Sequence, residues 1–186
     1  MAKIGLTNFR YGILTEGNDG TPTYGGALTP GKAVSCTVDI TNNDASLYAD
    51  DALAESDTSF AGGSVTMGVD EADLTTMSNL LGHTLTEGVM TRSVNDVAPY
   101  VGLGRIVTKM VANTPKYKVE FLYKVKFSEP SQDNQTKGES VEFSTTELQG
   151  TVAALANGNW SVTEEFTTKE AALTYLESLF GSSPSH

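Results

Sequence analysis

The segment KYKVEFLYKVKF, residues 116–127, decides the fold, because apolar and charged side chains alternate along its whole length. Every second position holds an aromatic or aliphatic residue: Tyr117, Val119, Phe121, Tyr123, Val125 and Phe127. The positions between them are mostly charged: Lys116, Lys118, Glu120, Leu122, Lys124 and Lys126. A period of two predicts a β-strand with one apolar face and one mostly charged face. At about 3.3 Å per residue it spans roughly 40 Å, about twice the commonest strand length.

Two further runs flank this strand in the sequence. Residues 105–112 are apolar and rich in β-branched side chains, and Asn113-Thr114-Pro115 separates them from the long strand. Asparagine tolerates turn dihedral angles and proline can open a strand, so the two runs are predicted to form a hairpin. A third strand is predicted at residues 139–156, after the turn-rich residues 128–138. Together the three runs predict a meander of long strands.

The rest of the chain predicts more strands and two helices. Alternating apolar residues predict strands in five other places: residues 4–14, 32–41, 65–69, 84–92 and 160–166. A first helix is predicted between Asp70, which can cap it, and Gly82, with leucines on one face. Thr167 and Glu170 form a capping-box pattern that predicts a second helix. The predicted class is mainly β, with a flanking helix and a second short helix.

Length and charge exclude several classes of protein. A chain of 186 residues can bury roughly 70% of the surface that its unfolded form exposes, so we expect one domain at residues 1–180 and a flexible tail at residues 181–186. The formal net charge of −11 argues against a protein that grips nucleic-acid phosphates. Neither a signal-peptide core nor an apolar run of membrane-spanning length is found, so we expect synthesis in the cytoplasm and no membrane partner.

Two long connections are predicted between strands. Residues 16–31 are rich in Gly, Asn, Asp, Thr and Pro, and residues 42–63 mix acidic with apolar side chains. The second connection contains Asp44, Leu47, Tyr48, Asp50, Asp51, Leu53, Glu55, Asp57 and Phe60. The acids lack the spacing of a calcium loop, so no metal site is expected. Two interpretations stay open: a surface that docks on a neighbouring chain, or a solvated excursion with small contacts of its own.

Residues typical of catalysis form no recognisable pattern. Cys36 alternates with valines, which predicts a buried thiol. His83 follows the first helix without a recognisable nucleophile or metal ligand, which predicts a structural role. Gly102 and Gly104 lack the third glycine and the helix of a dinucleotide-binding loop. We therefore expect no enzymatic activity, no cofactor and no metal.

The lysines of the central strand allow two interpretations. Lys116, Lys118, Lys124 and Lys126 can pair with an acidic segment of a neighbouring subunit. They can also form the solvated face of a strand, where lysines discourage unwanted edge pairing. The sequence leaves both open.

Five extended stretches are similar to one known family. They are NFRYG (residues 8–12), GTPTYGG (20–26), LYADDALAESD (47–57), APYVGLG (98–104) and YKVEFLYKVKFSEP (117–130). These stretches resemble the major tail proteins of long, non-contractile-tailed bacteriophages that infect Gram-positive bacteria. The similarity runs from the N-terminus to about Phe180.

The resemblance implies a tail-tube-type β-sandwich or open barrel flanked by a helix. It implies a structural virion protein of the tail, made in the host cytoplasm, that assembles into stacked hexameric rings. The implied partners are further copies of the chain, a tape-measure protein and other tail proteins. Genomic DNA is expected to pass through the lumen during ejection without specific binding.

Simple geometry agrees with an assembly of several copies. Barrels of roughly 16–18 strands enclose an aqueous channel, and a channel wide enough for duplex DNA needs more strands than that. One chain of this length cannot supply them, so we expect the central strands to stay incomplete until neighbouring copies close the cylinder.

The hypothesis names a set of residues as contacts between subunits or rings. They are Tyr24, Leu47, Tyr48, Asp50, Asp51, Glu55, Asp57, Lys116, Lys118, Lys124 and Lys126. The alternative function is a monomeric β-sandwich binding module for a cell surface or glycan. Such a module needs an aromatic platform, for which the candidates are Tyr11, Tyr24, Tyr48 and Tyr100.

Overall fold

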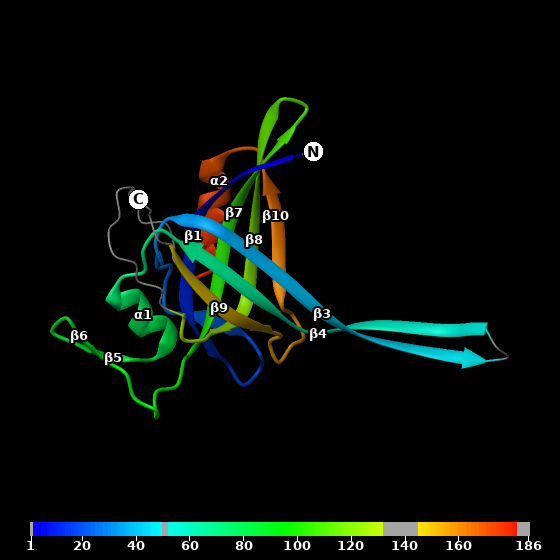
Figure 1. Cartoon of the computed structure of the whole chain (residues 1–186). Helices are drawn as coiled ribbons and strands as arrows, with labels where there is room; N and C mark the ends of the chain where they lie inside the picture. The colour runs from blue at the N-terminus through cyan, green and yellow to red at the C-terminus, as the bar shows by residue number, and fades with distance from the viewer. Residues whose placement is uncertain (1, 50–51, 132–144, 182–186) are drawn as a thin grey trace, which may run out of the picture.

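Most of the chain forms one large antiparallel sheet (Figure 1). The computed structural model describes residues 2–49, 52–131 and 145–181. The sheet has eight strands in the order β2-β1-β7-β8-β9-β4-β3, with β10 also paired to β8. Its strands are β1 (Ala2–Glu16), β2 (Pro22–Tyr24), β3 (Ala33–Ala49), β4 (Ala52–Val69), β7 (Tyr100–Val111), β8 (Thr114–Phe127), β9 (Thr146–Ala153) and β10 (Ser161–Phe166). A separate small hairpin joins β5 (Thr84–Thr86) to β6 (Val89–Thr91), and the helices are α1 (Leu74–Leu81) and α2 (Lys169–Ser178). The mainly β class with two helices is confirmed.

The predicted meander is confirmed, because β7, β8 and β9 are neighbours in this order. The turn between β7 and β8 lies at Ala112 and Asn113, both with positive φ, and Pro115 already belongs to β8. The third strand begins at Thr146, and the first part of its predicted range lies outside the described residues, as does the predicted tail after Gly181.

The alternation of β8 does not produce one apolar and one charged face, so this prediction is wrong. Val101 pairs with Val125 but Leu103 pairs with Leu122, so an extra residue bulges from β8 around Tyr123 and Lys124. Before the bulge, Val119 and Phe121 pack against α2, whereas after it Val125 and Phe127 join the core on the opposite face. Leu122, which lies among the charged positions in the sequence, is buried in that same core.

The bulge also marks a fork in the sheet. Before it, β8 pairs with β10, and after it, β8 pairs with β9, which leads on to β4 and β3. The sheet curls so that β1 and β3 come near each other (Figure 1). The result is an open barrel.

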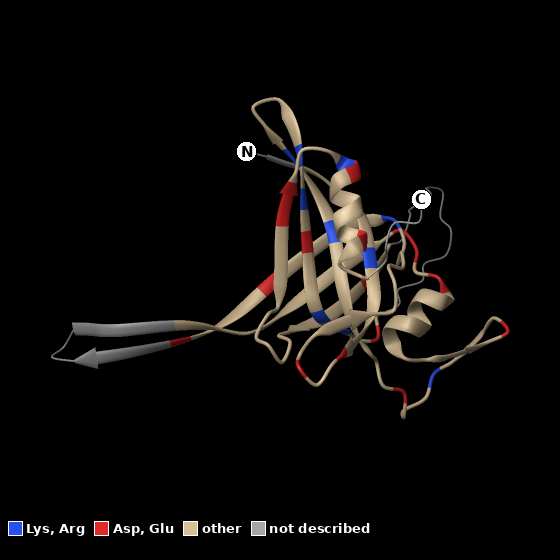
Figure 2. Ribbon diagram, turned by 180° about the vertical axis from the view of Figure 1, so that it is seen from behind, with Lys and Arg blue, Asp and Glu red and all other residues tan. Residues whose placement is uncertain are grey.

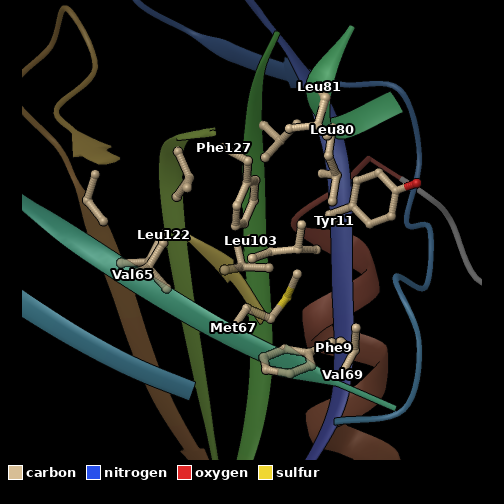
Figure 3. Packing of buried hydrophobic residues seen from close by; sticks show 14 of the residues in the cluster. Phe9, Tyr11, Val65, Met67, Val69, Leu80, Leu81, Leu103, Leu122 and Phe127 are labelled. Carbon is tan, nitrogen blue, oxygen red and sulfur yellow. The ribbon is translucent and has the colours of Figure 1, made fainter. Parts of the chain in front are cut away.

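Two hydrophobic cores lie on opposite faces of the sheet. The larger one fills the inside of the curl, where Phe9, Tyr11, Leu103 and Met67 point toward one another (Figure 3). Helix α1 contributes the buried side chains Met77, Leu80 and Leu81 to this core. The smaller core lies under α2 and consists of Ile106, Val119, Phe121, Ala172, Leu176 and Phe180.

The glycines of the VGLG stretch make room for the smaller core. A Cβ at Gly104 would lie 2.3 Å from Leu176 Cδ1, and one at Gly102 would lie 2.5 Å from the Tyr24 ring. These glycines therefore allow α2 and the residues around β2 to approach β7 closely, which is one reason for glycine in a strand.

Both helices begin later than their predicted caps. Asp73, not Asp70, caps α1 by accepting a hydrogen bond from Thr76 N at 2.7 Å. Asp70 instead accepts hydrogen bonds from the backbone amides of Lys32 and Glu71. Thr168, not Thr167, caps α2, and Gly82 ends α1 in the left-handed conformation as predicted.

Three predicted segments have a different structure. Residues 84–92 form the two short strands β5 and β6 instead of one strand. Residues 16–31 contain β2, which pairs with the end of β1, and Leu28 forms a further bridge with Tyr11. Residues 42–63 are not an irregular connection: they form the outer part of the long β3–β4 hairpin.

The central strands are not incomplete within one chain, which corrects another expectation. β7 pairs with β1 and β8, and β8 pairs with β7 on one side and with β9 and β10 on the other. In the described part of the chain, the outer edges of β2, β3 and β10 have no paired strand, and neither has the part of β1 before Tyr11 on the side away from β7. Any sheet extension by another copy must therefore use these outer strands.

Candidate assembly surface

The outer part of the β3–β4 hairpin projects away from the body of the protein (Figure 1). We call residues 42–60 the arm. Its two strands stay paired from Asn42 and Phe60 to Ala49 and Ala52, which is eight residue pairs. At about 3.3 Å per residue the arm extends roughly 26 Å. β9 pairs with β4 only from Gly63 to Val69, so the arm is two strands wide.

The base of the arm is fixed to the body by aromatic stacking. The rings of Phe60 and Trp160 lie 4.9 Å apart and nearly parallel, at 4°. A register shift and Gly62, with φ of 147°, lie beside Phe60 and mark the point where the arm leaves the sheet. The sequence does not indicate that Trp160 contacts Phe60, because the two residues lie 100 positions apart in the chain.

The arm is rich in acidic residues. The sequence contains no lysine or arginine between Lys32 and Arg92, and the arm carries five acids. Asp44 is exposed and accepts a hydrogen bond from Thr58 Oγ1 at 2.8 Å (Figure 2 shows the described acids in red). Of the predicted contact residues, Leu47, Tyr48, Glu55 and Asp57 lie on the paired backbone of the arm, while Asp50 and Asp51 lie outside the described residues.

The four lysines of β8 do not share one surface. Lys124 Nζ lies 2.7 Å from Glu16 Oε2 and 4.8 Å from the centre of the Tyr100 ring, and Lys126 also approaches this ring. The hydrogen bond from Lys124 lowers the pKa of Glu16. These two lysines have contacts within their own chain, which favours the structural interpretation for them.

Lys116 and Lys118 lie on the other side of the bulge. Lys118 Nζ lies 2.6 Å from Glu120 Oε1, and Arg105 binds the same carboxylate at 2.5 Å. Burial raises the pKa of Glu120, but these two cations outweigh it, so the pKa is lowered overall. Among the described residues, Lys116 has no carboxylate within ion-pair distance, but its charge helps to lower the pKa of Glu165.

The tyrosines are divided between the core and the surface. Tyr11 is 2% exposed, and its hydroxyl accepts a hydrogen bond from Asn79. Tyr24 packs edge-on against Phe121 and Phe180, and its hydroxyl donates to the carbonyl of Tyr123 at 2.8 Å. Burial strongly raises the pKa of Tyr24. Tyr11 and Tyr24 therefore belong to the inside of their own chain and do not present an exposed aromatic platform.

His83 lies at the centre of a charged cluster that sequence reasoning missed. Its Nδ1 lies 2.8 Å from Asp96 Oδ2, and its Nε2 lies 2.8 Å from Glu129 Oε2. Arg92 donates to the other oxygen of Glu129 at 2.8 Å. The cluster ties the end of α1 to the loop before β7 and to the end of β8, so its geometry is that of a structural clamp. Asp96 and Glu129 raise the pKa of His83.

In the described ranges, no three His, Cys, Asp or Glu side chains come together in a way that would hold a metal ion. Neither of the helices described is long and apolar enough to cross a membrane. Comparison of the chain with protein-family models and with curated protein sequences finds no match.

Proposed function

We propose that this chain is the major tail protein of a long, non-contractile bacteriophage tail, a structural protein whose activity is self-assembly. In this proposal copies of the chain form hexameric rings, the rings stack into a tube, and the tube guides DNA during ejection. The resemblance of five sequence stretches to this family supports the proposal. The structural observation that carries it is the arm.

A two-stranded hairpin without further strands is marginally stable in water. The arm has eight residue pairs beyond the point where β9 ends, and both of its outer edges lack a paired strand in the described chain. Such long open edges favour association with another chain. A second copy that covers the arm would supply the missing layer, so the arm fits a protein that functions in an assembly.

The size of the sheet supports several copies per ring. Eight strands closed on themselves leave room only for side chains or one small ligand. A lumen for duplex DNA needs several sheets side by side, and the free edges of β1, β2, β3 and β10 are where they can meet. The net charge of −11 suits a conduit, because a wall without dense positive charge leaves the phosphates their counterions.

Electron microscopy of the purified protein tests the proposal. We expect rings or tubes in negative stain, with the tape-measure protein and other tail proteins added if the chain alone stays dispersed. A monodisperse monomer under all these conditions would overturn the proposal and favour the binding module.

A variant that lacks most of the arm tests the role of the arm alone. Residues 44–58 are replaced by an Asn-Gly turn, which keeps the part of β3 and β4 that pairs with the body. We expect loss of rings and tubes, while the circular dichroism spectrum keeps the strand signal of the body and loses only the part that the arm contributes. Normal tube formation by this variant would contradict the role of the arm while leaving the tube proposal intact.

A further inference from the structure

Residues 84–98 lead from the end of α1 toward β7, and we call them the strap. Its strands β5 and β6 pair with each other, and no strand of the large sheet in the described chain pairs with them (Figure 1). Val89, Val94 and Val97 are more than half exposed, while Met90 packs against the larger core. A segment with so few buried contacts opens more easily than the sheet, so each contact that holds it has a large effect.

The His83 cluster fastens both ends of the strap to the body. His83 directly precedes the strap, and Arg92 and Asp96 lie in its second half. Glu129, two residues after β8, accepts a hydrogen bond from Arg92 on one oxygen and faces His83 with the other. Asp96 faces the second nitrogen of the His83 ring. Glu129 is therefore the anchor on the body, and His83 and Arg92 are the two groups that hold it.

The geometry at His83 fits a charged imidazole. Nδ1 lies 2.8 Å from Asp96 Oδ2, and Nε2 lies 2.8 Å from Glu129 Oε2. An ionised carboxylate can only accept hydrogen bonds, so both ring nitrogens have to carry a proton, as they do in imidazolium. A neutral ring would turn a lone pair toward one of the two carboxylates at this short distance.

The surrounding charges favour the same form. Asp96 and Glu129 are the ion-pair partners of His83 among the described residues, and α1, β5 and β6 carry no charged side chain. The ring also follows the C-terminal end of α1, where the helix carbonyls favour a cation. With imidazolium, the charges of His83, Arg92, Asp96 and Glu129 sum to zero, whereas a neutral ring leaves one negative charge in excess.

We propose that His83 is a proton-operated latch. The imidazolium form holds the strap on the body through Asp96 and Glu129, and loss of one ring proton releases the strap from Glu129 while the large sheet stays folded. The latch acts within one copy of the chain and does not depend on the proposed assembly.

The contact to Glu129 is the one that opens. Asp96 Oδ2 also accepts a hydrogen bond from Ser93 N at 2.8 Å, and the Asp96 side chain is 16% exposed, so water cannot easily replace the ring there. The Glu129 side chain is 46% exposed and can exchange His83 for water. The last ring proton is therefore expected on Nδ1. The strap then keeps the Arg92–Glu129 pair, and ion pairs between such exposed side chains contribute little.

Hydrogen exchange of the dispersed protein at pH 6 and pH 8.5 tests the latch, with rates corrected for intrinsic chemical exchange. We expect the protection of the strap amides to fall at least about fivefold between these values, while the amides of β7 and β8 stay unchanged. His83→Gln should show the lower protection at both values. His186→Gln removes the other histidine of the sequence and is the matched control, which should behave as the parent.

Glu129→Gln separates a latch from a purely structural clamp. The new amide can accept the hydrogen bond of Arg92 and donate one to the lone pair of a neutral Nε2, but it opposes the N–H of imidazolium. We expect strap protection in this variant to be at least as high at pH 8.5 as at pH 6. The same fall as in the parent would overturn the latch.

Nitrogen NMR of the His83 ring in the parent supplies a readout that needs no variant. We expect both nitrogens protonated at pH 6, the Nδ1–H tautomer at pH 8.5, and a titration midpoint above the value of about 6.5 for free histidine. A neutral ring at pH 6 or an Nε2–H tautomer at pH 8.5 would overturn the inference. Equal strap protection at both pH values in the parent would overturn it as well.

Discussion

Phe60 and Trp160 form a stacked pair, with ring planes 4° apart, that joins the base of the arm to the residue before β10. Stacked aromatic pairs stabilise by about 0.5–1.5 kcal/mol beyond the area that they bury. Through this pair the arm has a fixed starting point on the body, although its outer part has no neighbour in the described chain.

Removal of the Trp160 ring is expected to loosen the arm. We expect Trp160→Ala to lower the free energy of unfolding by about 2 kcal/mol. This loss is smaller than the cost of about 3–5 kcal/mol for replacing a fully buried aromatic side chain by alanine, because Trp160 is half-buried. Urea denaturation measures this change. Trp160→Phe retains an aromatic partner for Phe60 and should recover most of the loss, and equal loss in both variants would contradict the role of stacking.

Hydrogen exchange should separate the arm from the rest of its hairpin. In the dispersed protein, the amides of residues 42–60 are expected to exchange faster than those of residues 63–69, because only the latter part of β4 lies between two strands. On assembly, the arm amides should become protected. Arm amides that exchange equally fast before and after assembly would show that no other copy covers the arm.

A methyl group at Gly102 is expected to disturb the core under α2. Its Cβ would lie 2.5 Å from the Tyr24 ring and 2.8 Å from the Phe121 ring, and rigid rings cannot move aside as a flexible chain end can. We expect Gly102→Ala to cost about 1–3 kcal/mol in a denaturation experiment. Gly5→Ala is the control, because its nearest contact, Thr108 Cβ at 3.8 Å, is an ordinary one. Equal stability of the two variants would refute the close-approach argument.

The His83 cluster predicts a specific dependence of stability on pH. Asp96 and Glu129 raise the folded-state pKa of His83 above its unfolded value. The contribution of His83 is therefore complete below about pH 6.5 and is lost as the pH rises through the folded-state pKa. The pKa of Asp96 is lowered by His83, so its own contribution is lost as the pH falls below about 4.

Urea midpoints measured at several pH values test this dependence. For the parent we expect a higher midpoint near pH 6 than near pH 8.5, and for His83→Gln we expect a smaller difference between these two values. The remaining His186 is common to both proteins and serves as an internal control. An equal pH dependence in both proteins would show that another group is responsible.

The sequence predicts the middle of the sheet well, because the physical signal there is strong. The alternation in residues 116–127 and the β-branched run before it identify β7 and β8. The sequence cannot show the bulge around Tyr123 and Lys124, because the alternation of apolar residues continues unbroken through the bulge. The face of each later side chain is set by pairing with β7 and β9, which is tertiary information.

The arm shows the opposite case. Its residues form strands without a strand pattern in the sequence, because no third strand of the described chain pairs with this part of the hairpin. Polar residues such as Asn42 and Asn43 then resemble a loop in the sequence. The pairing of Lys3 with Lys109 is equally invisible in the sequence, since it exists only through the pairing of β1 with β7.

The pairing of β1 with β7 also sets the order of events during synthesis. Ile13 pairs with Val101 and Ala2 with Met110, so β1 has no central partner until nearly a hundred more residues have been synthesised. At 5–20 residues per second this delay is roughly 5–20 s. For that time the edge of a strand of 15 residues lacks its central partner, which favours association with other nascent chains during synthesis.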